Sequence, residues 1–128
     1  GGRVAIVAVA VAGLVAIVPP LWGTVALERS YDAAAENQLD DALGAARSAI
    51  KAQPYAASPR AQEAVLLQRQ GDLKGALAAV RDATDREPRN WSHWLLLSRL
   101  AAREGDRDLA VRARRRAEQL NPPLLDLR

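Results

Sequence analysis

The chain has 128 residues and a formal net charge of +3. This length allows one domain of ordinary size, or a small domain plus an accessory segment, and excludes a multidomain enzyme. Apolar residues make up 49%, yet aromatic residues only 4%, with no Phe, Met or Cys. Any core must therefore be built from Ala, Leu and Val, a composition that favours closely packed helices. The lack of Cys excludes disulfides and thiolate chemistry, and the single histidine excludes a metal cage of several histidines. The small positive excess gives little reason to expect a nucleic-acid partner.

The first predicted element is an apolar stretch from Val4 to Leu27, with no charged residue between Arg3 and Glu28. As a helix it would be about 36 Å long, against a hydrocarbon core of about 30 Å. Pro19 and Pro20 interrupt the stretch and predict a kink. We therefore predict a kinked transmembrane helix within residues 1–27 that places the chain in a bacterial inner membrane. The nearly balanced charges at its two ends leave the side of the membrane open.

Two alternatives for this stretch remain open. A secretory signal peptide would also show a basic start, an apolar run, a helix break and small residues such as Thr24 to Ala26 before a cleavage site. A buried helix of a soluble protein is the second alternative, although the rest of the chain offers no large apolar surface to cover it. The start Gly1-Gly2-Arg3, without Met, leads us to expect a segment of a longer polypeptide.

Beyond Glu28 the sequence repeats itself with a period of 34 residues. Self-similarity at a fixed period of this length is the sequence signature of a repeat protein. The recurring positions are Pro54, Pro88 and Pro122; Ala42, Ala76 and Ala110; Ala49, Ala83 and Ala117; Leu43, Leu77 and Val111; and the turn pairs Asn37-Gln38, Gly71-Asp72 and Gly105-Asp106.

Each period reads as a helix, a tight turn and a second helix that a proline ends. Gly71 and Gly105 permit the left-handed backbone that ends a helix, and Asp72 and Asp106 can cap the helix that follows. Alanine at the shared positions lets paired helices approach closely. Beyond the apolar run over 4–18, we predict helices over residues 21–36, 39–53, 59–70, 73–86, 91–104 and 107–120, with helix starts at Ser58-Pro59 and Asn90. Leu124, Leu125 and Leu127 are expected to fold back over the last helix as a minimal cap.

The repeat resembles the tetratricopeptide repeat (TPR) family, whose 34-residue pattern has Trp, Leu and Gly in its first helix and Ala, Phe, Ala and Pro in its second. The last repeat matches this pattern at Trp94, Leu97, Gly105-Asp106, Ala110, Ala117 and Pro122. It departs at Ser98, where the family prefers Gly, and at Arg114, where it prefers an aromatic residue; the middle repeat has Arg60 in place of Trp.

The resemblance implies an all-α fold, a TPR helix-turn-helix solenoid of about 2.5 to 3 repeats. A degenerate first repeat would cover residues 28–56 and continue from the membrane helix, two TPR repeats would cover residues 57–124, and residues 125–128 would form a C-terminal tail. Such folds bind proteins or peptides on the face made by the first helices of the repeats. This face is mildly basic and would suit an acidic peptide or a peptide carboxylate. The candidate residues on it are Val65, Gln68, Arg69, Leu95, Arg99, Ala102 and Arg103.

We predict no catalytic, cofactor-binding or metal-binding residue and no small-molecule substrate. His93 is expected to be a solvated or capping side chain without an obvious partner. The run Arg112, Arg114, Arg115 and Arg116 is interpreted as a solvated outer face near a helix end. It lacks the interleaved aromatic residues that would stack on nucleic-acid bases.

The predicted role is therefore protein interaction or assembly, without a reaction of its own. The order of apolar helix, degenerate repeat and two TPRs looks like the C-terminal tail of bacterial O-antigen ligase-like membrane proteins. In such a parent the glycan-transferring residues would lie outside this chain. The alternative is a single-pass anchored assembly factor or chaperone, similar to the TPR parts of cytochrome c maturation proteins, that binds a client peptide. A secreted lipoprotein is disfavoured because no Cys follows the apolar stretch.

Overall fold

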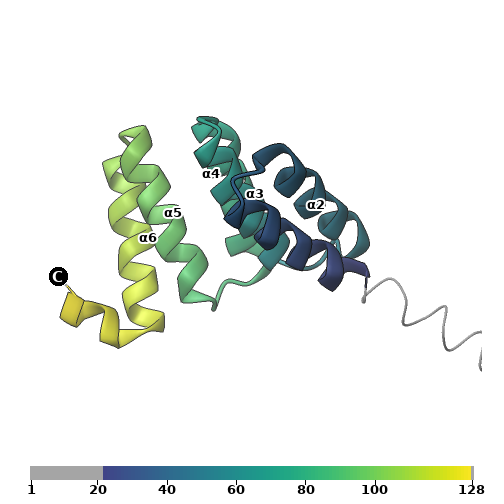
Figure 1. Cartoon of the computed structure of the whole chain (residues 1–128). Helices are drawn as coiled ribbons and strands as arrows, with labels where there is room; N and C mark the ends of the chain where they lie inside the picture. Colours follow the sequence, from purple (N-terminus) through teal and green to yellow (C-terminus); the bar gives the residue numbers. More distant parts are fainter. Residues whose placement is uncertain (1–21, 128) are drawn as a thin grey trace, which may run out of the picture.

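A computed structural model describes residues 22–127 of the chain, and within this range all regular secondary structure is helical, without a strand (Figure 1). In Figure 1 the helix over residues 22–35 and its neighbour α2 lie at one end of a row, and α5 and α6 lie at the other. Each helix packs against the next one along the chain. The elements are the helix over residues 22–35, then α2 (Leu39–Ala52), α3 (Ser58–Arg69), α4 (Leu73–Arg86), α5 (Trp91–Glu104), α6 (Arg107–Leu120) and the short 3-10 helix η1 (Pro122–Leu127). The six helices predicted between residues 21 and 120 are thus confirmed to within about two residues.

The three turns inside the repeats have the same backbone geometry. Asn37, Gly71 and Gly105 have φ angles of 59°, 87° and 88°, the left-handed region that a helix end often uses. After the two glycines, Asp72 accepts a hydrogen bond from the backbone nitrogen of Gly75, and Asp106 accepts one from that of Leu109. The predicted turns and aspartate caps are therefore confirmed.

The links between repeats follow the predictions less closely. Asn90 caps α5 by accepting a hydrogen bond from the backbone nitrogen of Ser92 at 3.2 Å, as expected. The first residue of α3 is Ser58 and its cap position is Ala57, which makes no side-chain capping bond. Pro59 still lies in the first turn, where its missing N–H leaves no helical bond unmade.

The core is built from alanines and a few larger aliphatic side chains, as the composition indicates. The recurring alanines Ala49, Ala83 and Ala117 are fully buried, and so are Ala42 and Ala76. Their small side chains let paired helices approach closely, and Leu66, Val80 and Leu100 fill the remaining space. Ala110 departs from this series and is only half-buried, because no further helix follows α6 within the described residues.

The predicted membrane segment is only partly within the described residues. Residues 4–21, including the predicted kink at Pro19-Pro20, lie outside them. Residues 22–27, predicted as the end of the span, instead form the first turns of a helix that continues to residue 35 beside α2. The small residues Gly23 and Ala26 permit this close approach: Gly23 is buried, and a Cβ atom there would lie 2.7 Å from the Gln53 side chain. None of the helices in residues 22–127 is long and apolar enough to cross a membrane.

The C-terminal tail folds back on α6 at Leu124; the side chain of Leu127, also expected in this cap, lies outside the described residues. Leu124 is 5% exposed, whereas Leu125 is 48% exposed. Arg114 of α6 donates a hydrogen bond from Nη2 to the carbonyl oxygen of Leu124 at 3.3 Å. The expected minimal cap is therefore confirmed for Leu124, and it is wrong for Leu125.

Candidate functional site

The predicted peptide-binding face draws on α3 and α5, the first helices of the second and third repeats. Its α3 residues are Val65, Gln68 and Arg69, and its α5 residues are Leu95, Ala102, Arg99 and Arg103. Val65, Gln68 and Leu95 are partly buried, and the three arginines and Ala102 are exposed. Val65 and Arg99 are one period apart, and so are Arg69 and Arg103, so each pair holds the same place in successive repeats.

Arg69 has a structural role in this arrangement. Its Nη1 donates to the carbonyl oxygen of Ala34 at 3.1 Å, and its Nη2 donates to Oδ1 of Asn37 at 3.0 Å. Both acceptors lie at the end of the helix over residues 22–35, so Arg69 ties α3 to the first repeat. Arg69 was predicted to bind a ligand together with Arg99 and Arg103, but its guanidinium is already engaged by these two acceptors.

Arg99 and Arg103 differ from Arg69 because neither makes a hydrogen bond or ion pair with another residue in the part of the chain described. They are four residues apart on α5, which places them as neighbours on one side of the helix. Two exposed guanidinium groups one turn apart form a cationic pair that can receive a carboxylate through charge-assisted hydrogen bonds. This pair is the strongest anion-recognising feature of the predicted face.

Tyr31 belongs to the same face and was not among the predicted residues. It lies one period before Val65 and two before Arg99, so that the period itself could have identified it. The side chain is 48% exposed. Desolvation by partial burial raises the pKa of the Tyr31 hydroxyl above its usual value of 10.0. Like any tyrosine, Tyr31 is a neutral donor at physiological pH. The face therefore runs from an aromatic residue in the first repeat to two cations in the third.

His93 was expected to be a solvated or capping side chain without an obvious partner, and the solvated position and the lack of a partner are both wrong. It is 6% exposed, and its Nε2 lies 3.2 Å from Oε2 of Glu87 and 3.1 Å from Nδ2 of Asn90. Beside it, Trp94 donates from Nε1 to the carbonyl oxygen of Pro88 at 2.8 Å. These contacts fasten the turn between α4 and α5, and so His93 has a structural role with Glu87 as its partner. Within residues 22–127 there is no group of three or more metal-ligating side chains.

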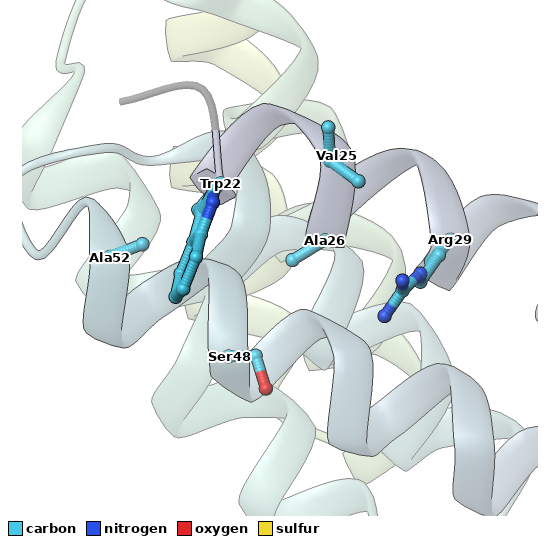
Figure 2. Close-up of a pocket in the computed structure, with 6 residues that line it drawn as sticks. All are labelled: Trp22, Val25, Ala26, Arg29, Ser48 and Ala52. Carbon is cyan, nitrogen blue, oxygen red and sulfur yellow. The ribbon is translucent and has the colours of Figure 1, made fainter. Parts of the chain in front are cut away.

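A depression of about 350 Å³ lies at the N-terminal end of the row, between the helix over residues 22–35 and α2 (Figure 2). Figure 2 shows Trp22 and Ala26 on the side of their helix that faces α2. Trp22 and Val25 are 71% and 51% exposed. The lining of this depression is mostly apolar, and its polar side chains are Arg29 and Ser48. This set holds no acid–base pair or nucleophile with an activating partner.

The predicted run of four arginines on α6, from Arg112 to Arg116, does not form one solvated face. Arg114 donates from Nε to Oε1 of the buried Glu118 at 2.9 Å and also holds the tail at Leu124. Arg112 and Arg115 are exposed, and Arg116 is half-buried. The predicted solvated run is therefore wrong for Arg114, whose i,i+4 spacing to Glu118 was a readable signal.

Comparison with known proteins identifies the fold. No family model and no curated protein matches the sequence. Among solved structures, the first TPR of Spaghetti (RPAP3) bound to the HSP90 peptide SRMEEVD superimposes with a TM-score of 0.78 at 14% identity, covering 80% of this chain and 82% of that one. The Arabidopsis OM64 TPR domain gives 0.77 at 18% identity, covering 82% and 87%. A crystal structure of MamA gives 0.74 at 14% identity and covers 81% of this chain, which spans 61% of the MamA chain.

These likenesses agree with the 34-residue period, the left-handed turns and the buried alanines. At this level of identity they establish the fold and leave the ligand open. Within residues 22–127 the chain is an all-α, TPR-like helical solenoid.

Proposed function

We propose that this chain is a protein-interaction module that binds an acidic peptide segment on the face formed by the first helices of its repeats. The observation that carries the proposal is the exposed and unengaged pair Arg99 and Arg103 on α5, in line with Val65 and Tyr31 on the preceding first helices. Arginine forks pair with carboxylates in two-pronged geometry. The partly buried Val65 and Leu95 offer apolar contacts beside the cations.

A structural neighbour offers support for this class of ligand. The first TPR of Spaghetti (RPAP3) is bound to the peptide SRMEEVD, which contains two glutamates and one aspartate. We infer that the present chain uses its cationic pair on a peptide of similar charge. A row of three repeats forms a shallow face, so we expect modest affinity and a strong dependence on salt.

The test is binding of fluorescein-labelled heptapeptides with a free C-terminal carboxylate, measured by anisotropy, with SRMEEVD as the reference member of the set. The variant Arg99→Glu with Arg103→Glu should lower the affinity for the tightest-binding acidic peptide by at least about tenfold. The matched control is Arg81→Glu with Arg112→Glu, which makes the same charge change at exposed positions of the second helices α4 and α6 and should leave binding within about twofold.

Circular dichroism should show the same helicity for both variants, since all four side chains are exposed. Retained binding in the Arg99/Arg103 variant, or equal losses in both, would show that this face is not the peptide site.

We further propose that residues 4–21 attach the module to a membrane, as an extension of the sequence interpretation. These 18 residues carry no charge and would reach about 27 Å as a helix, close to the hydrocarbon core of about 30 Å. Trp22, exposed next to them, suits the interfacial region where aromatic residues gather. Flotation with phospholipid vesicles should retain the full chain and release a chain that starts at residue 22, and equal behaviour would refute the attachment.

The origin of the module remains a prediction from the order of its elements. An O-antigen ligase-like parent predicts many apolar spans encoded upstream of Gly1. A single-pass assembly factor, similar to the TPR parts of cytochrome c maturation proteins, predicts a start codon close to Gly1. Reading the upstream coding sequence separates the two.

A further inference from the structure

The face of the last repeat that points away from the rest of the row is covered only by Leu124 of η1 within the described residues. Leu43, Leu77 and Val111 hold the same place in successive repeats; Leu43 is 7% exposed, Leu77 is partly buried, and Val111 is 49% exposed. In the first repeat, α3 covers this place. At the last repeat it opens into a hollow of about 490 Å³ lined by Ser98, Ala110, Val111, Arg114 and Arg115.

Three polar contacts hold α3 on the corresponding face of the first repeat. Nε2 of Gln62 donates to Oγ of Ser30 at 3.3 Å. Nε of Arg47 donates to Oε1 of Glu63 at 3.2 Å. Nε2 of Gln70 donates to Oδ1 of Asp40 at 2.9 Å. The first repeat thus offers a hydroxyl, a guanidinium and a carboxylate, and α3 supplies the matching groups.

The last repeat carries the same three residue types at the same places. Two periods after Ser30, Asp40 and Arg47 stand Ser98, Asp108 and Arg115. A hydrogen bond within each of the two repeats is also the same: Ser30 donates to the carbonyl oxygen of Ala42 at 2.7 Å, and Ser98 donates to that of Ala110 at 2.8 Å. Asp108 and Arg115 are exposed and make no hydrogen bond or ion pair within the described residues.

The middle repeat shows that this set is not a general requirement of the fold. Its equivalents are Ala64, Lys74 and Arg81, and the helix that covers it, α5, presents the buried Leu97 where α3 presents Glu63. The last repeat therefore has the same polar residues as the first repeat has where α3 packs on it, and not those of the middle repeat where α5 packs on it.

One position differs between the two faces. Arg114 stands where Ala46 is fully buried under α3. Its guanidinium is bonded to Glu118 and to the carbonyl of Leu124, so its charge is already partly compensated. A helix that packs on this face would contact the aliphatic part of the Arg114 side chain, which is larger than Ala46. A small residue on that helix would make room for it.

We propose that the end face formed by Ser98, Asp108, Val111 and Arg115 binds an amphipathic helix of a partner protein. By equivalence with Gln62 and Glu63 of α3 and with Gln70 directly after its last residue, that helix presents a carboxamide followed directly by a glutamate, and a second carboxamide about two turns after the first. The apolar stripe of the helix covers Val111. This surface is separate from the peptide face, because it uses the end of the row instead of the side lined by the first helices.

Charge complementarity favours a partner protein over a second copy of this chain. In a head-to-tail dimer the helix over residues 22–35 of one copy would take the place of α3. That would set Arg29, in the place of Glu63, opposite Arg115, and Asp32 in the place of the fully buried Leu66. Both placements are unfavourable.

The probe is a fluorescein-labelled peptide with the sequence of residues 57–71, stapled on its solvent side because an isolated helix of this length is marginal in water. Anisotropy against the full chain should show saturable binding. Arg115→Glu should weaken binding of the probe by at least about tenfold. A peptide with Glu63→Arg should bind the Arg115→Glu variant as the original probe binds the unchanged chain, and should bind the unchanged chain poorly. The control Arg112→Glu makes the same charge change at another exposed place of α6, equivalent to Gly44 of α2, and should bind normally.

Absence of saturable binding, equal losses from Arg115→Glu and Arg112→Glu, or failure of the reversed charges to rescue would each overturn the proposal. Sedimentation equilibrium of the chain alone should show a monomer, and a dimer that Arg115→Glu dissociates would show that a second copy occupies the face. The Arg99/Arg103 variant should bind this probe normally, which separates this surface from the peptide face.

Discussion

Arg60 and Trp94 lie one period apart and make the same hydrogen bond. Arg60 donates from Nη2 to the carbonyl oxygen of Pro54 at 2.8 Å, and Trp94 donates from Nε1 to that of Pro88 at 2.8 Å. The two prolines are also one period apart. Arginine thus replaces the tryptophan expected from the TPR pattern while keeping its donor, and it adds an ion pair to Asp82 at 3.1 Å.

This equivalence predicts that Arg60→Ala lowers the free energy of unfolding by about 1–3 kcal/mol, because the Arg60 side chain is only 11% exposed and both partners would lose their contact. Arg60→Trp should cost less, since an indole can donate to the same carbonyl. Urea unfolding followed by circular dichroism measures both. If Arg60→Ala unfolds at the same urea concentration as the unchanged chain, the bond to Pro54 contributes nothing.

The backbone conformations of two glycines predict opposite effects of alanine substitution on stability. Gly105 has a φ of 88°, and nothing lies within 4 Å of an added Cβ atom, so Gly105→Ala should destabilise the fold by about 1 kcal/mol through backbone strain alone. Gly44 lies inside α2 with open space around it, and Gly44→Ala should stabilise the fold by about 0.5–1 kcal/mol. Thermal unfolding should move down for the first variant and up for the second; shifts in the same direction would contradict the turn geometry.

The buried alanines predict a steric effect in the second helices. Ala83→Leu adds volume at a fully buried place and should cost about 1–3 kcal/mol of unfolding free energy. Ala78 on the same helix is exposed, and Ala78→Leu should change stability by less than about 0.5 kcal/mol. Equal midpoints for the two variants in urea would argue against close packing at Ala83.

The contacts of Arg114 predict that it secures the C-terminal end. Arg114→Ala leaves Glu118, which is 5% exposed, without its guanidinium partner and frees the carbonyl of Leu124. We expect a loss of about 1–3 kcal/mol and faster amide hydrogen exchange in η1. Arg112→Ala removes an exposed arginine of the same helix and should leave both quantities unchanged. Slow exchange in η1 of the Arg114 variant would show that Leu124 alone holds the tail.

The environment of Tyr31 predicts a titration that can be isolated by one substitution. Tyr31 and Tyr55 are the two tyrosines, and Tyr55 is 68% exposed, so Tyr55→Phe leaves Tyr31 as the sole phenolate signal in ultraviolet absorbance. Its midpoint should lie above 10.0, because burial disfavours the phenolate. The folded state then binds the proton more tightly than the unfolded state, so this contribution to stability is complete below the unfolded pKa and is lost as the pH rises through the folded pKa. A midpoint at or below 10.0 would contradict this environment.

Much of the fold could be predicted because its signals are local. The helix ends at Gly71 and Gly105, the caps at Asp72, Asn90 and Asp106, and the recurring alanines all depend on residues a few places apart. The candidate site was predicted less well. The spacing placed Arg69, Arg99 and Arg103 on first helices, but it could not show that Arg69 is bonded to Asn37, 32 residues earlier in the chain.

The period, the helices and the turns follow from local sequence, since backbone conformation at glycine and aspartate depends on short-range sterics and hydrogen bonds. Which side chains of equal character are engaged and which are open depends on tertiary packing. Arg69 and Arg114 find acceptors because neighbouring elements bring a carbonyl or carboxylate within reach. Arg99, Arg103 and Arg115 lie on exposed faces where no acceptor among the described residues comes within reach. That difference depends on how successive helices pack, and packing brings together residues that are far apart in the sequence.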